Sequence, residues 1–293
     1  IPHDYKNKIC KFINFEDDGF EVQKHKGLIK TIHEKDRKEH LLKVWRGETE
    51  AETKFCVKTT IEAEDEWLHS FYYFNDEIPK EEDFEKTMAD YLTFEFNMIT
   101  HGKEYFFEEK DKINIINKDL KLSSLEWKEF KISNFFEVSG TITTHPTKLK
   151  PNGKTPRITC ASTNNGLDAT YDNEPTEKGK ILTVDSATIG YVAYQENDFI
   201  ATDHVEKIMF KNGKSMNRYL GLFIKQCIDN SVLSKYGYGY KFSQNRIKKQ
   251  IIKLPVNSKG QPNWEFMENF MRKIEYKKLN IYLDYIKNKT TTN

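Results

Sequence analysis

The feature that most constrains this chain is a reversal of charge near residue 120. Residues 1–120 carry 19 Lys and Arg against 28 Asp and Glu, a net charge of −9, whereas residues 121–293 carry 27 against 17, a net charge of +10. A chain of 293 residues can form one large or two ordinary domains. The reversal favours two, so we expect an acidic first domain over 1–120 and a basic second one after it.

Composition places the chain among globular proteins. Hydrophobic residues make up 37% and aromatic residues 13%, enough to fill cores despite a charged content of 31%. No stretch approaches 18 consecutive apolar residues, and the N-terminal segment lacks the order of a signal peptide. We therefore expect a cytoplasmic protein without a membrane partner. The four cysteines lack metal-ligand spacing, which predicts free thiols at Cys10, Cys56, Cys160 and Cys227.

Two helices and a turn are predicted in the acidic part. Asp17-Asp18-Gly19 stands between apolar, alternating runs and predicts the turn of a β-hairpin. Residues 36–44 predict a short basic helix. Pro79 followed by acidic residues predicts the start of a second helix, because carboxylates favour its positive end. Apolar residues recur there at helical spacing and predict a core-facing stripe: Phe84, Met88, Tyr91, Leu92 and Phe96.

The basic part predicts an α+β domain with a mixed sheet over residues 121–262. It contains a short strand at 127–132, several β-rich runs punctuated by glycine, and an amphipathic helix within 216–230. Residues 263–293 then predict one long helix. Its apolar residues alternate at spacings of three and four, interrupted by Lys278, and resemble a coiled-coil seam for dimerisation: Trp264, Met267, Met271, Ile274, Ile281 and Tyr285. The alternative is that this seam packs on its own domain.

Motifs for catalysis are absent from the sequence. There is no phosphate-binding glycine loop, zinc-protease helix or nucleophile elbow, and no Asn-Pro-Pro-Tyr or Asp-Pro-Pro-Tyr of an amino-methyltransferase. Glu126/Lys128 and Glu129/Lys131 fit the Glu-x-Lys part of a nuclease motif but lack a Pro-Asp upstream. We predict no catalytic residue and no metal site here, and keep a nuclease as an alternative.

Two segments of the basic part have the chemistry of a DNA-binding surface. Asn, Ser and Thr of CASTNNG can pair with base edges, while Arg157 and Lys148 can hold guanine or phosphate; Asn164-Asn165-Gly166 also fits an ordinary turn. In KYGYGYKFSQNR, glycines alternate with tyrosines, which fits either a phosphate-gripping loop or a bent strand. The DNA-binding candidates are Thr144, His145, Lys148, Arg157, Ser162, Thr163, Asn164, Asn165, Tyr236, Tyr238, Tyr240 and Lys241.

These segments resemble a known family. Residues 126 to about 275 resemble the DNA specificity (S) subunit of type I restriction-modification systems, in the single-domain form of BcgI-like enzymes. The similar segments are WKEFKISNFFEVSG, RITCASTNNGL, GKILTVDSATIGYVAYQENDFIATDHVEKI, KYGYGYKFSQNRIKKQIIKLP and SKGQPNWEFMENFM. Residues 1 to about 105 resemble the C-terminal part of the partner adenine methyltransferase (M) subunit, through FINFEDDGF, KHKGL, HLLKVWRG and DEWLHSFYYFNDEIPKEEDFEKTMADYLTF.

The resemblance implies a division of labour in a bacterial restriction-modification enzyme. A target recognition domain reads double-stranded DNA in the major groove, and a methyltransferase methylates adenine N6 with S-adenosylmethionine. We then expect the chain itself to bind no cofactor, because S-adenosylmethionine would bind in a catalytic domain upstream of it. Its partners would be that methyltransferase region, a possible restriction subunit, and a second copy paired through the C-terminal helix. The alternative of an anti-restriction regulator would favour an acidic specificity half, whereas this half is basic.

Overall fold

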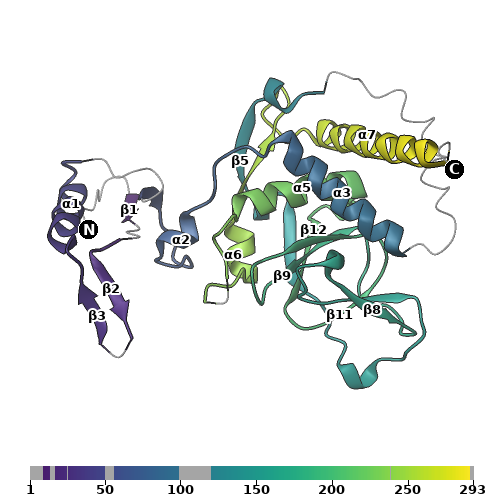
Figure 1. Cartoon of the computed structure of the whole chain (residues 1–293), viewed down its shortest axis with the longest axis horizontal. Coiled ribbons are helices and arrows are strands. Elements are labelled where there is room, and N and C mark those ends of the chain that lie inside the picture. Colours follow the sequence, from purple (N-terminus) through teal and green to yellow (C-terminus); the bar gives the residue numbers. More distant parts are fainter. Residues whose placement is uncertain are drawn as a thin grey trace. The chain divides into compact units, whose positions relative to one another are not determined.

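The computed structural model divides into two compact units, residues 1–73 and 74–293 (Figure 1). The expected boundary near residue 120 therefore does not coincide with the division between the units. The structure describes residues 9–13, 17–24, 26–49, 56–98, 120–237 and 239–290.

Unit 1 consists of two strand pairs and two helices. Strand β1 pairs antiparallel with β4, and β2 with β3. The hairpin expected across Asp17-Asp18-Gly19 is therefore wrong, since β1 and β2 have different partners. A turn does form there, and Asp17 Oδ1 accepts the N–H of Gly19 at 2.9 Å. The elements are β1 Ile9–Ile13, β2 Phe20–Gln23, β3 Gly27–Lys30, α1 Glu34–Arg46, β4 Cys56–Thr60 and α2 His69–Tyr72.

Unit 2 holds the β-sheet part of the fold. An antiparallel sheet has the order β10-β9-β12-β6, a second has the order β11-β7-β8 with β11 parallel to β7, and β13 pairs with β5. The predicted α+β class with mixed strand directions is confirmed. The strands are β5 Trp127–Lys131, β6 Phe136–Gly140, β7 Thr155–Ile158, β8 Leu167–Tyr171, β9 Ile181–Asp185, β10 Val192–Gln195, β11 Ile200–Ala201, β12 Val205–Phe210 and β13 Ile251–Pro255.

Helices α3, α5 and α7 pack against one another on this β-structure (Figure 1). They meet at Phe84 of α3, whose ring stacks on Phe223 of α5 at 4.5 Å between centroids and meets the edge of Phe270 of α7 at 5.5 Å. All three rings are fully buried. The helices are α3 Glu81–Met98, α5 Arg218–Ser231, α6 Gln244–Lys249 and α7 Trp264–Thr290, with short 3-10 turns at Leu122–Ser124, Ile132–Asn134, Pro146–Lys148 and Asn164–Gly166.

The core-facing stripe of α3 explains why the units divide after residue 73. Phe84, Met88, Tyr91 and Leu92 are at most 5% exposed within the core of unit 2. Thr87 Oγ1 also donates to Gln226 Oε1 of α5 at 2.6 Å. Because α3 buries its apolar face on α5 and α7, it folds as part of the basic domain although it lies in the acidic half of the sequence.

Charged groups join the same three helices. Arg218 Nη2 lies 2.9 Å from Glu275 Oε1, and its Nη1 lies 3.8 Å from Glu95 Oε2. Tyr219 OH donates to Glu275 Oε2 at 2.6 Å. Burial raises the pKa of Glu95 above its ordinary value. At the other end of α3, hydrogen bonds from Lys277 and then Lys278 lower the pKa of Glu85. The ion pairs fix α3 relative to α5 and α7.

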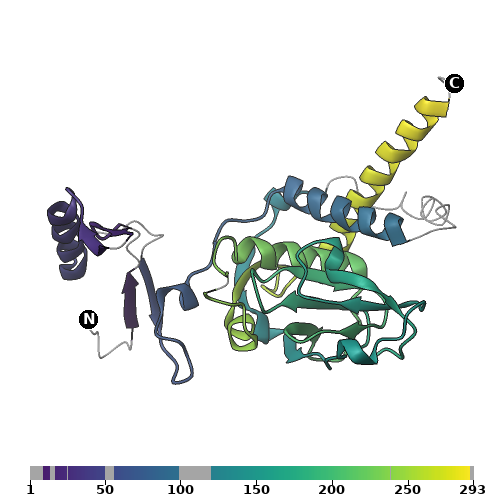
Figure 2. The ribbon, with the colours of Figure 1, turned by 60° about the horizontal axis from the view of Figure 1, so that its bottom comes forward.

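The apolar seam of α7 is used inside its own unit. Met267, Met271 and Ile274 are at most 1% exposed, and the half-buried Trp264 packs edge-on against Phe135 and Phe210. The prediction that these four residues pair with a second copy is therefore wrong, because the helix packs on its own domain. Ile281 and Tyr285 remain 58% and 60% exposed. Figure 2 shows the last turns of α7 extending beyond the other helices of the unit.

No described helix is long and apolar enough to cross a membrane. Cys10, Cys160 and Cys227 carry free thiols, as predicted; the side chain of Cys56 lies outside the described residues.

Candidate nucleic-acid interface

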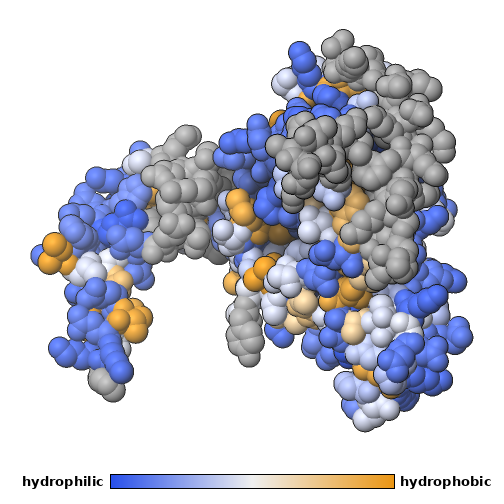
Figure 3. Space-filling model, turned by 45° about the vertical axis from the view of Figure 1, so that its right-hand side comes forward, coloured by the Kyte–Doolittle hydropathy of each residue, from blue (hydrophilic) through white to orange (hydrophobic). Residues whose placement is uncertain are grey.

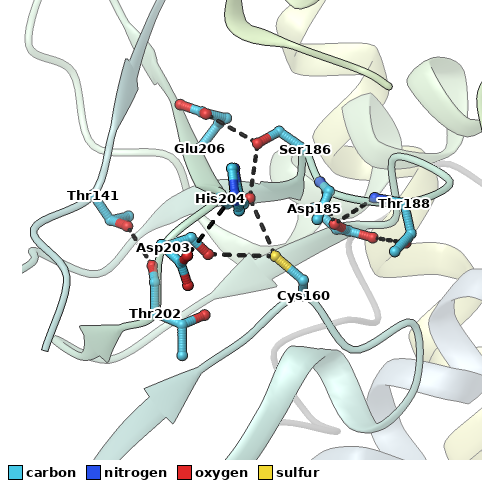
Figure 4. Close-up of polar contacts among 10 residues, drawn as sticks. Thr141, Cys160, Asp185, Ser186, Thr188, Thr202, Asp203, His204 and Glu206 are labelled. Carbon is cyan, nitrogen blue, oxygen red and sulfur yellow. Dashed lines mark hydrogen bonds and ion pairs between the residues drawn. The ribbon is translucent and has the colours of Figure 1, made fainter. Parts of the chain in front are cut away.

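Four loops meet at one end of the β-structure of unit 2, and we call them the strand-end loops. They are residues 141–144 after β6, 160–166 after β7, 186–190 after β9, and 202–204 between β11 and β12. Thr141 Oγ1 donates to Thr202 O at 3.3 Å, and Ser186 N donates to His204 O at 2.9 Å. Figure 4 shows these contacts. Segments far apart in the sequence thus form one polar surface.

Buried polar groups hold these loops in place. The carboxylate of Asp185, which is 4% exposed, accepts the N–H groups of Ala187 and Thr188 at 2.7 and 3.1 Å, and the Thr188 hydroxyl. Ser186 Oγ lies 3.0 Å from Glu206 Oε1. Burial, and then the charge of Asp185, raise the pKa of the Cys160 thiol to about 12. Cys160 therefore stays a protonated hydrogen-bond donor at neutral pH.

The Asn-Asn-Gly segment forms the expected turn. Asn164, Asn165 and Gly166 have φ values of +50°, +54° and +77°. The side chain of Asn165 is buried and donates to Tyr194 O at 2.7 Å, so it anchors the loop to β10 and does not face solvent. Ser162, Thr163 and Asn164 are exposed. Of this predicted set, the structure therefore presents three residues on the surface and uses the fourth for support.

The predicted residues before and within β7 divide in the same way. Arg157 is committed to an internal ion pair, with its Nη1 2.8 Å from Asp168 Oδ2 and only 11% of its side chain exposed. Thr144 is buried, and its N–H donates to Ala201 O at 2.8 Å. His145 and Lys148 are exposed. The geometry therefore disfavours Arg157 and Thr144 as direct DNA contacts.

The tyrosine segment is packed rather than open. Tyr236 is 9% exposed, stacks on Phe242 at 4.3 Å and donates to Gln250 Oε1 at 3.1 Å. Tyr240 lies under Arg246, whose Cζ is 3.7 Å from the ring centroid. Lys241 is half-buried. Tyr236 and Tyr240 therefore support the surface from beneath, and Tyr238 lies outside the described residues.

Gly190 connects the tyrosine segment to the strand-end loops. It has a φ of +82°, and an added Cβ would lie 2.8 Å from Cδ1 of Phe242. The loop 186–190 therefore rests directly on the Phe242 ring. Ile189 beside it is 56% exposed. On the face that Figure 3 shows, the surface is largely hydrophilic and its hydrophobic residues form small, separate patches.

Sequence reasoning missed His204 and the 186–190 loop. Both fall within segments that carried the family resemblance, but neither was given a role. His204 has a φ of +60° and an exposed side chain. The sequence does not indicate that His204 has a positive φ, since His-Val-Glu is typical of the start of a strand.

A cavity of about 620 Å³ adjoins the loop 160–166. Its wall includes Lys86 and Asp90 of α3, and Lys225 and Asp229 of α5, which form ion pairs within each helix at 2.7 and 2.5 Å. Burial raises the pKa of Asp229. Helix α3 therefore lies beside the loop that carries Ser162–Asn164.

No group of three or more His, Cys, Asp or Glu residues in the described part of the chain could hold a metal ion. Glu126 and Lys128 form an exposed ion pair at 3.3 Å.

A profile of the family described as "Type I restriction modification DNA specificity domain" matches residues 124–283, more than half of the chain. The chain belongs to this family. The resemblance of the second part of the sequence is thereby confirmed, and the match covers the sheets, α5 and most of α7.

Two curated relatives come from Heyndrickxia coagulans. The type II restriction enzyme and methyltransferase RM.BcgI is 56% identical over 103 residues, which cover 35% of this chain and 16% of that protein. The specificity subunit S.BcgI is 30% identical over 191 residues, 64% of this chain and 54% of that subunit. The chain spans about half or less of the length of these relatives.

Solved structures similar to this chain include two specificity subunits. The type I S subunit from M. genitalium has a TM-score of 0.37 at 12% identity, covering 72% of this chain and 55% of that one. The HsdS subunit from Thermoanaerobacter tengcongensis has a TM-score of 0.37 at 7% identity, covering 78% and 54%.

Proposed function

We propose that this chain is the sequence-reading part of a restriction-modification enzyme and binds a specific site on duplex DNA. The observation that carries the proposal is the family match over 124–283, which falls on the unit whose strand-end loops present exposed polar side chains. Hydroxyl and amide side chains in such loops can discriminate base edges. The net charge of +10 over residues 121–293 supplies the general attraction to phosphate.

The exposed residues take two roles in this proposal. Ser162, Thr163 and Asn164 contact base edges, while His145 and Lys148 contact the sugar-phosphate backbone, with Lys241 at the margin. Arg157, Asn165 and Tyr236 shape the surface through the contacts described above. This division follows the exposure of each side chain, since a side chain that is itself largely buried and already bonded must lose that contact to reach DNA.

We also propose that residues 1–120 derive from the C-terminal part of an adenine methyltransferase. The support is the 56% identity to an enzyme that is both a restriction enzyme and a methyltransferase. The two matched lengths, 103 and 191 residues, together come to about the length of the chain. S-adenosylmethionine would bind in a catalytic methyltransferase part outside these residues, and the chain would direct adenine-N6 methylation to the site it reads.

The exposed end of α7 is the part of the helix that we propose for pairing with a second copy. Ile281 and Tyr285 are four residues apart and therefore lie on one face of the helix. Pairing through this face would bring two recognition domains together on a symmetric DNA site.

A selection experiment tests the proposed function. The chain is equilibrated with a pool of randomised duplexes at two salt concentrations, and the bound duplexes are sequenced. We expect one sequence to be enriched and the total affinity to fall as salt rises. Asn164→Ala should change the preference at specific base pairs, whereas Lys148→Ala should weaken all sequences alike. Recovery of the pool without any preferred sequence would refute the proposal.

A further inference from the structure

His204 has a backbone conformation that L side chains rarely adopt. Its φ is +60°, in the left-handed region that glycine enters without steric cost and that histidine tolerates better than most residues. It stands between β11 and β12, where the chain turns at the polar end of the sheet. Glycine would make the same turn with less backbone strain. The presence of an imidazole at this position therefore calls for a functional explanation.

Three segments fix this turn by binding its carbonyl oxygens. His204 O accepts the N–H of Ser186 at 2.9 Å, and also lies 2.9 Å from Ser186 Oγ and 3.2 Å from Cys160 Sγ. The preceding carbonyl, of Asp203, lies 3.5 Å from the same sulfur. The one before that, of Thr202, accepts from Thr141 Oγ1. Three consecutive carbonyls are thus held by side chains from three separate loops.

The groups that hold His204 are mostly turned inward. Ser186 is 6% exposed and Glu206 is 8% exposed, whereas the His204 side chain is 56% exposed. Figure 4 shows the contacts converging on the His204 backbone. The network therefore positions one imidazole at the surface in a defined place. Strained backbone that its surroundings hold so fully is typical of functional sites.

The chemistry of the surroundings favours a base edge as the target. His204 Nε2 lies 3.8 Å from Asp203 Oδ2, so an imidazole and a carboxylate stand together at the rim. A carboxylate disfavours the approach of phosphate, whereas an imidazole N–H can donate to the N7 acceptor that purines present in the major groove. The loop 160–166 with its exposed polar residues reaches the same network through Cys160.

We propose that His204 is a specificity-determining residue that reads a purine in the recognised DNA sequence. The inference rests on the proposed function and assigns one base-pair position of that function to one side chain. Its neighbours Cys160 and Ser186 are positioning residues, since they act through the His204 backbone.

The test compares sequence discrimination in variants of the whole chain. The sequence selected by the parent is made as a defined duplex, together with duplexes that change each base pair singly, and affinities are measured in competition. His204→Gly and His204→Asp, neither of which can donate a hydrogen bond to a purine N7, should each lose about tenfold or more of the parent's discrimination at one base pair or two adjacent ones. The other positions should keep theirs. Aspartate and glycine both accept a positive φ, so the loop is preserved.

Lys180→Gly is the matched control. Lys180 also has a positive φ, of +58°, and precedes β9 at the opposite end from the strand-end loops. The substitution Lys180→Gly should relieve similar backbone strain while leaving sequence discrimination unchanged. Thermal melting checks that each variant is folded; if His204→Gly does not fold, His204→Asp decides.

Two outcomes overturn the inference. One is unchanged discrimination in the folded His204 variants. The other is an equal loss for every sequence, which would make His204 a phosphate contact. If the parent itself selects no sequence, the proposed function fails instead, and that result is visible before any variant is made.

Discussion

Replacing Phe84 with alanine should unfold the recognition domain far more easily, although Phe84 lies in the acidic half of the sequence. Its ring is fully buried, 4.5 Å from the Phe223 ring and 5.5 Å from the Phe270 ring between centroids. Removing a buried phenylalanine side chain costs about 3 to 5 kcal/mol, from lost burial and from the cavity left behind. Three helices hold the site, so it can collapse only partly, and we expect a value in that range.

Such a loss is large against the total stability of a domain, which is about 5 to 15 kcal/mol. The aromatic contacts contribute to it, since offset and edge-on ring pairs add about 0.5 to 1.5 kcal/mol beyond the area they bury. The surrounding helices α3, α5 and α7 would lose their shared contact at one position. The prediction therefore tests whether α3 belongs to unit 2.

Urea unfolding followed by tryptophan fluorescence measures the effect. Replacing Trp45 and Trp67 with phenylalanine in every variant leaves only Trp127 and Trp264, which both report on unit 2. Lys86→Ala on the same helix is the control, because its side chain is 77% exposed and such surface changes stay within about 0.5 kcal/mol. A loss below about 1 kcal/mol for Phe84→Ala would refute the assignment of α3 to this unit.

Four further predictions concern charge and the exposed end of α7. Glu85 has a lowered pKa, so the stability it contributes above its ordinary pKa of 4.5 is lost as pH falls, and Glu85→Gln should flatten the acid side of a urea-unfolding series. Glu95 has a raised pKa, so the stability that its protonated form contributes is lost as pH rises from the ordinary pKa of 4.5 through the raised one, and Glu95→Gln should remove this fall in the free energy of unfolding. If Glu85→Gln and Glu95→Gln gave the same dependence of unfolding free energy on pH, both directions of pKa shift would be contradicted. Glu275→Ala should cost about 1 to 3 kcal/mol in urea unfolding, because it removes the nearer carboxylate of the largely buried Arg218 and the acceptor of Tyr219 OH and leaves Arg218 only Glu95 at 3.8 Å; a loss under about 1 kcal/mol would show that the pair is dispensable. Ile281→Glu with Tyr285→Glu should leave the chain folded, as thermal melting checks, and lower the molar mass in light scattering, whereas an unchanged mass would end the pairing proposal.

The four longer helices of this fold, α1, α3, α5 and α7, could be predicted because their signals are local. Pro79 and the acidic residues after it mark the start of α3, and the spacing of its apolar residues marks the buried face. Asn217 caps α5 by accepting the N–H of Leu220 at 3.0 Å. The position of the unit boundary could not be predicted in this way. An apolar stripe shows that a helix must be covered, but it does not identify the surface that covers it.

The wrong prediction for the apolar seam of α7 has the same cause, because the sequence does not identify the surface that covers it. Met267, Met271 and Ile274 recur at spacings that two helices of a coiled coil would share, and equally at spacings that fit α3 and α5 of the same chain. Phe84 and Phe223 fill the facing surface here. The last turns extend past that cover, so of the predicted seam residues Ile281 and Tyr285 keep the exposure that pairing requires.

Side-chain direction is what the sequence could not supply at the candidate interface. Asn164 and Asn165 are adjacent and chemically identical, yet the exposed Asn164 donates to the nearby carbonyl of Leu167 at 3.3 Å, while the buried Asn165 donates to the carbonyl of Tyr194, far along the chain. Which of two such residues turns inward depends on acceptors that only the folded sheet brings near. Glycine-rich polar loops must first satisfy their own backbone before they can read DNA, because an unpaired buried polar group is costly. Residues that support the surface and residues that contact DNA therefore belong to the same polar types, so composition alone does not separate them. At His204, Ser186 and Cys160 bond to the backbone carbonyl, and the imidazole stays exposed for the base contact proposed above.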